Sequence, residues 1–144
     1  MTRSFAFAAV FAAVTLAASP SAMADVNNVG SIDGIWRNAK NSLHIEVKPC
    51  SEGTCGYVVW ASEKAQEDAR KGGTEKLVGM QILREFVPDK RGSWRGRVFV
   101  PDLNAIFRGT AEMIDRGTLR ARGCLLVNII CKSQIWTRVD GAAG

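Results

Sequence analysis

The sequence predicts an all-β protein, a small eight-stranded antiparallel up-and-down barrel with one longer charged insertion. Two observations point to this fold. Short runs in which apolar and polar residues alternate recur along the chain, separated by Gly, Pro, Asn and Asp. Four cysteines form two pairs, Cys50 with Cys55 and Cys124 with Cys131, and each pair brackets a short turn between two strand-like runs. Eight antiparallel strands in this length can close into a barrel, which removes exposed sheet edges; a two-sheet sandwich is the alternative.

Residues 1–24 have the features of a cleavable signal peptide. A positive start at Arg3 is followed by the apolar stretch FAFAAVFAAVTLAA, which is short for a bilayer span, and by an A-x-A site at residues 22–24. We expect a single barrel domain over residues 25–144, located in the periplasm or outside the cell. An uncleaved N-terminal anchor is the alternative.

The barrel strands are expected where alternation is clearest. In chain order the runs are Gly34–Arg37, Leu43–Lys48, Cys55–Ala61, Met80–Val87, Trp94–Val100, Ala105–Ile114, Thr118–Cys124 and Cys131–Val139. The insertion SEKAQEDARKGGTEKL, from Ser62 to Leu77, predicts about two helical turns that end at Gly72 and Gly73. Its charges are typical of a solvated face, and a lid over one mouth of the barrel is the alternative.

Alternation also assigns the two faces of the later strands. Two arginines lie two residues apart in WRGRVFV and again in TLRARG, so the charged face should be outside and the apolar face inside. The inward positions mix large residues with five small ones, Gly96, Gly109, Ala111, Ala121 and Gly123. Either the small residues leave a pocket for one small ligand, or they allow strand coiling while large residues fill the gap. The candidate ligand-binding residues in the lumen are Trp94, Val98, Phe107, Gly109, Ala111, Met113 and Leu119.

The cysteines predict two disulfides, one within each hairpin. Residues opposed across an antiparallel pair lie at the Cα separation that a disulfide requires, and an exported chain meets an oxidising compartment. Each bridge should contribute about 2 kcal/mol. A zinc site of four thiolates is the alternative, but the spacings are looser than those of zinc knuckles. We expect no metal.

Catalysis and nucleic-acid binding find little support in the composition. The formal charge of +5 is mild, and no run of Lys and Arg is interleaved with aromatic residues. His44 is the only histidine, and the carboxylates form no paired motif. We expect neither an enzyme nor a cofactor, and no membrane span beyond the leader.

The tip of the last hairpin is unusually apolar. Either it folds over and plugs one barrel end, or it contacts an envelope protein or a membrane. The residues concerned are Leu125, Leu126, Val127, Ile129 and Ile130.

Two further patterns carry a resemblance to known families. If the first and last strands meet, Arg138 can lie over the Trp36 indole. Gly34, Trp36 and Arg138 thus resemble the G-x-W and terminal-strand arginine of lipocalins and related calycin barrels, where they clamp the closed end. The wider pattern, PC…CGYVVWA, GMQIL…F, W-R-G-R-V and RGC…CKSQIWTRV, resembles the secreted bacterial family named domain of unknown function 2147 over about residues 32–139.

That resemblance implies a small lipocalin-like barrel and no agreed activity. The chain departs from the family in the insertion, where a loop rich in Gly, Pro and Asn is expected, and in Val-Pro-Asp-Leu-Asn, where a Tyr-Asp-Pro turn is usual. Two functions stay open. One is a non-catalytic carrier or sensor for a small apolar or amphipathic molecule; the other is an envelope interaction module with a filled barrel.

Overall fold

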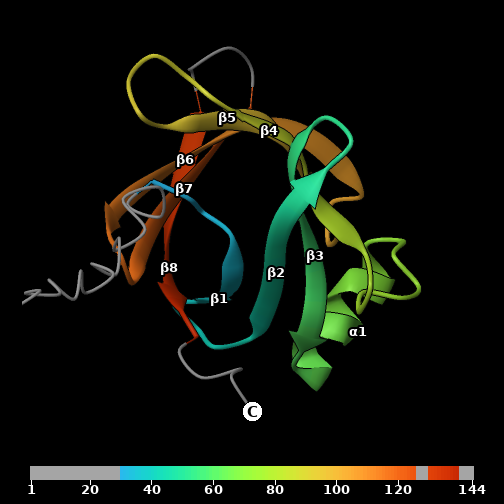
Figure 1. The fold of residues 1–144 in the computed structure, drawn as a ribbon. Helices are drawn as coiled ribbons and strands as arrows, with labels where there is room; N and C mark the ends of the chain where they lie inside the picture. Colours follow the sequence, from blue (N-terminus) through green and yellow to red (C-terminus); the bar gives the residue numbers. More distant parts are fainter. Residues whose placement is uncertain (1–29, 126–129, 140–144) are drawn as a thin grey trace, which may run out of the picture.

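The computed structural model describes residues 30–125 and 130–139, which form eight strands and one helix (Figure 1). In chain order these are β1 (Gly34–Asn38), β2 (Leu43–Cys50), β3 (Gly53–Ala61), α1 (Glu63–Lys71), β4 (Gln81–Pro88), β5 (Trp94–Val100), β6 (Ala105–Asp115), β7 (Thr118–Leu125) and β8 (Ile130–Arg138). The eight strands predicted from the sequence are all present.

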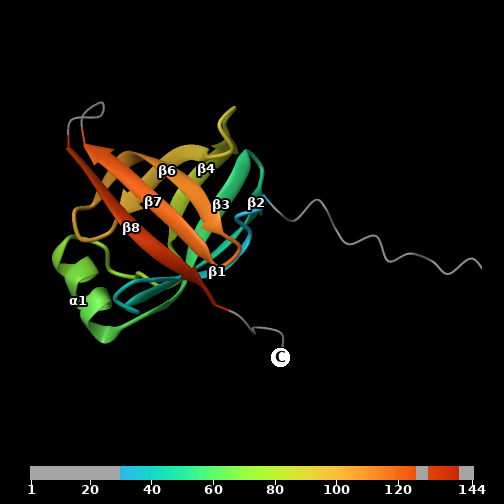
Figure 2. The same cartoon turned by 90° about the vertical axis from the view of Figure 1, so that its left-hand side faces the viewer.

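The strands close into an antiparallel barrel in which each strand pairs with its neighbour along the chain. The wall formed by β6, β7 and β8 faces the viewer in Figure 2. Closure depends on β1 and β8, whose pairing runs only from Trp36 opposite Arg138 to Asn38 opposite Trp136. The predicted up-and-down barrel is therefore confirmed, and the sandwich is excluded.

The interior of the barrel is apolar and contains several large side chains. Alternation on β2 and β3 turns Ile45, Val47 and Val58 inward, where they are buried. The largest fully buried side chains are Trp36, Phe86, Ile32, Ile45, Leu119, Val47 and Val58. Burial of large aliphatic and aromatic groups on this scale is the main contribution to the stability of a small domain.

The insertion forms a helix on the outside of the barrel, beside β3 and β4 (Figure 1). The Ser62 side chain caps α1 by accepting from the Ala65 N–H, and the helix ends at Gly72 as predicted. Beyond the helix, the hydroxyl of Thr74 donates a hydrogen bond to the carbonyl of Pro101, in the turn between β5 and β6. Ile82 points away from the lumen but is buried in one cluster with Ala69. The insertion thus covers an outer wall.

A β-bulge in β4 decides which side chains enter the lumen. Arg84 pairs with Arg97 and Val87 with Arg95, so Glu85 and Phe86 together oppose the single residue Gly96. Glu85 takes the left-handed conformation, with φ of 55°. After the extra residue, Phe86 points inward and is 1% exposed, whereas Val87 points outward and is 49% exposed.

Candidate functional site

The structure brings the predicted lumen residues together on the inner face of β5, β6 and β7. Val98 lies opposite Phe107, Trp94 opposite Ala111, and Met113 opposite Leu119. Gly109, Ala111 and Leu119 are buried, and the other four candidates, Trp94, Val98, Phe107 and Met113, are partly buried.

Two of the small inward residues, Gly96 and Gly109, make room for large side chains of neighbouring residues in the lumen. A Cβ atom on Gly96 would collide with the Phe86 ring, and one on Gly109 would collide with Val98 Cγ2 and lie 3.3 Å from Phe86 Cζ. The phenyl ring therefore fills the space that these two glycines leave. This part of the lumen is a packed core.

Gly123 is in a different environment. A Cβ atom there would meet no heavy atom within 4 Å. The β8 residues opposite Gly123 and Ala121 are Lys132 and Gln134, and both are exposed although they share the inner face. Since β1 pairs only with residues 136–138 of β8, no strand pairs with β8 beside Lys132 and Gln134 on the side away from β7. The wall of the barrel is therefore not closed at this end.

The opposite end is closed by a clamp between the first and last strands. The Arg138 guanidinium carbon lies 4.2 Å from the centroid of the Trp36 ring, a cation–π arrangement. Arg138 Nε donates to the carbonyl of Arg116 at 2.8 Å, and a second nitrogen donates to the carbonyl of Asp33. A side chain at Gly34, which has φ of 127°, would collide with the guanidinium. These contacts join the first and last strands of the barrel at this end.

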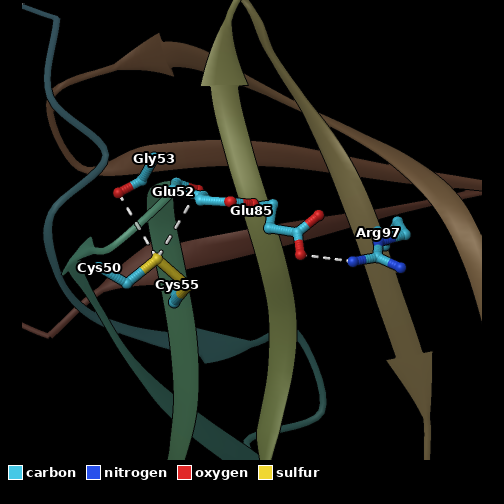
Figure 3. Close-up of a disulfide and its surroundings, with 6 residues drawn as sticks. All are labelled: Cys50, Glu52, Gly53, Cys55, Glu85 and Arg97. Atoms are coloured by element: carbon cyan, nitrogen blue, oxygen red, sulfur yellow. Dashed lines mark hydrogen bonds and ion pairs between the residues drawn. A yellow bond between two sulfur atoms is a disulfide. The ribbon is translucent and has the colours of Figure 1, made fainter.

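Both disulfides within the hairpins are present. Cys50 is bonded to Cys55, with 5.8 Å between the Cα atoms, and Cys124 is bonded to Cys131, with 4.0 Å. Figure 3 shows the first bridge at the tip of the β2–β3 hairpin. All four thiols are therefore occupied, which leaves none to ligate zinc. Of the predicted apolar tip, residues 126–129 lie outside the described residues, and Ile130 is exposed.

The outer wall carries a hollow that the sequence pattern did not predict. It has a volume of about 840 Å³ and lies over β5, β6 and β7. The residues that line it are Glu85, Arg91, Arg95, Gly96, Arg97, Ile106, Phe107, Arg108, Gly109, Thr110, Arg122 and Cys124. Alternation predicts that the arginines face outward, but it carries no information on the curvature of the wall that gathers them round one hollow.

Two acidic residues orient arginines at the edge of this hollow. Asp89 Oδ2 accepts from Arg95 Nε at 2.9 Å, and Glu85 accepts from Arg97 on the neighbouring strand (Figure 3). The pKa of Asp89 lies below its ordinary value, chiefly because its carboxylate accepts a hydrogen bond from the backbone N–H of Arg91, with Ser93 and Arg95 adding to the effect.

The only histidine has a structural environment. The His44 ring lies 4.7 Å from the ring of Trp60, and its Nε2 atom is 2.7 Å from Asn41 Oδ1. Across residues 30–125 and 130–139, His, Cys, Asp and Glu form no cluster of three or more that could hold a metal ion. In the same part of the chain, no helix has the length and apolar character needed to cross a bilayer.

Comparisons with known proteins agree with this architecture. A family model described as "Uncharacterized protein conserved in bacteria (DUF2147)" matches residues 34–138. Among solved structures, the chain is similar to HP1028 from Helicobacter pylori, which is described as belonging to the lipocalin family; the TM-score is 0.60 at 11% identity, over 77% of this chain and 84% of that one. No curated protein matches the sequence.

Proposed function

We propose a function from the premise that this chain belongs to the bacterial DUF2147 family and has a lipocalin-like barrel. In this proposal the protein is a non-catalytic binding protein of the periplasm or the extracellular medium. Its barrel is a filled scaffold, and its binding contacts lie on the outer wall.

The packing of Phe86 is the observation that carries this proposal. A barrel that transports an apolar molecule needs space among its inward side chains. Here the phenyl ring occupies the position that Gly96 and Gly109 leave free, and it is 1% exposed. Trp36 fills the closed end in the same way, at 0% exposed.

A second candidate function is a carrier that uses the unclosed end of the lumen. The open space beside Gly123 favours it, because Phe107 and Val98 line the same inner face and are only partly buried. A small apolar or amphipathic molecule would then lie in the lumen between β6 and β8, on the side of Phe86 that faces the unclosed end.

Substitutions of two glycines on one cross-strand pair separate these functions. If the lumen is filled, Gly109→Leu should lower the melting temperature, as should Ala111→Phe, whereas Gly123→Leu should be tolerated. The uncharged probe N-phenyl-1-naphthylamine should then show no saturable binding when it is followed by tryptophan fluorescence. Saturable binding that Gly123→Leu abolishes without loss of stability would refute the filled scaffold and establish the carrier.

The location is tested on the expressed chain. Intact-mass measurement of protein recovered from the periplasm or medium should give a chain that begins at Asp25 and gains mass on reduction of the two bridges. Recovery from the cytoplasm with residues 1–24 retained would contradict the proposed location.

A further inference from the structure

The arginines of the outer hollow form a row that is unusual for neighbouring strands. Arg97 and Arg108, which line the hollow, lie directly opposite each other on β5 and β6, and Arg84 on β4 continues the row beyond the hollow. Opposed residues in an antiparallel sheet have Cβ atoms about 5 Å apart, and like charges at that separation destabilise the sheet. Arg122 lies on β7, opposite Thr110 and diagonal to Arg108.

The acidic groups nearby neutralise only part of this charge. Arg95 is paired with Asp89 and Arg97 with Glu85. Arg108 and Arg122 make no ion pair with any residue that the structure describes, although both line the hollow. Five arginines and one glutamate line the hollow in all, so its lining carries a net positive charge.

The shape and the donors select one class of ligand. The volume of about 840 Å³ lies in the range of small-molecule sites. Guanidinium groups bind oxyanions through parallel hydrogen bonds. A carboxylate offers two oxygens and one charge, whereas a terminal phosphate offers three oxygens and nearly two charges, and can therefore accept from arginines on adjacent strands at once.

We propose that the hollow binds a phosphate-bearing ligand through Arg97, Arg108 and Arg122. Glu85 holds Arg97 in position from the bulge of β4, so that the guanidinium is oriented before the ligand arrives (Figure 3). Exposed Ile106 lies at one end of the hollow and can contact an apolar part of the same ligand. The proposal rests on the proposed function, because it takes the outer wall of the barrel as the binding surface. Discovery of a ligand in the lumen would refute the filled scaffold but would not refute the phosphate site.

The test compares two variants that lose the same charge. Arg108→Gln/Arg122→Gln removes the two arginines without acidic partners, and Arg37→Gln/Arg120→Gln removes two exposed arginines outside the hollow. Binding of pyrophosphate is measured by titration calorimetry at low salt, where electrostatic attraction is least screened. Sedimentation with vesicles that contain phosphatidic acid, against phosphatidylcholine vesicles, tests a terminal phosphate carried by a lipid.

The wild-type chain should bind pyrophosphate or the vesicles with phosphatidic acid, and the arm that responds identifies the source of the phosphate. The hollow variant should weaken that binding by at least about tenfold, and the control variant by less than about threefold. Equal loss in both variants would refute the site, because it would show a general charge effect. Absence of binding in both arms would also refute it. The uncharged naphthylamine probe, measured on the same samples, reports separately on the lumen.

Discussion

Replacement of Phe86 by alanine is the most direct test of the filled lumen. The side chain is 1% exposed and lies against Gly96 and Gly109, which have no side chains that could move into the vacated space. The cost should therefore lie in the upper part of the range for Phe→Ala in a core, about 3–5 kcal/mol. For a domain of this size, that corresponds to a fall in Tm of roughly 10–20 °C.

The assay is urea unfolding with the disulfides intact. Val87→Ala, on the next residue of β4 but 49% exposed, is the matched control and should change stability by less than about 0.5 kcal/mol. A double-mutant cycle with Gly96→Ala adds a second condition. The added methyl meets the Phe86 ring first, so it should destabilise the wild type but be better tolerated in the Phe86→Ala variant, where the ring is gone. A loss below about 1 kcal/mol for Phe86→Ala, or strict additivity in the cycle, would refute the filled lumen.

Three further predictions concern the clamp, a bridge and one carboxylate. Arg138→Ala should lower Tm by removing the stack on Trp36, worth about 1 kcal/mol or more, together with its hydrogen bonds, and unchanged Tm would contradict the clamp. Cys50→Ser/Cys55→Ser should cost about 2 kcal/mol in urea unfolding, and no loss would show that the bridge does not constrain the unfolded chain. The pKa of Asp89 is lowered in the folded state, so its stabilising contribution is present above its unfolded pKa and is lost as the pH falls through the folded value. Asp89→Asn should therefore reduce the loss of stability that is measured below about pH 4. An unchanged pH profile of stability would contradict this.

Local sequence signals predicted most of the fold because each acts over a few residues. Alternation located the strands, and the two glycines 72 and 73 end the helix, with Gly73 at the positive φ of 98° that favours glycine there. Hairpin geometry predicted both cysteine pairs, but only Cys124 and Cys131 lie directly opposite each other. Cys55 lies opposite Lys48 and is therefore diagonal to Cys50. The barrel itself followed from strand number and length, which leave few ways to remove two sheet edges.

The content of the lumen could not be predicted in the same way. Strict alternation from inward Leu83 would place Glu85 inside and Phe86 outside. The bulge at Glu85 reverses this, and a bulge at a residue other than glycine leaves no clear mark in the sequence. The arginine-lined hollow was missed for a related reason. Outward direction follows from alternation, but the curvature that brings β5, β6 and β7 round one space is a property of the closed wall.

The bulge in β4 also has an evolutionary consequence. Glu85 is the extra residue of the bulge, so its loss would leave Phe86 directly opposite Gly96 and still turned inward by regular alternation. The same event would remove the acid that holds Arg97. Loss of one codon would therefore change how an outer arginine is oriented while Phe86 stays in the lumen. The outer surface of this barrel can thus change by one residue without any change in its interior or in the number of its strands.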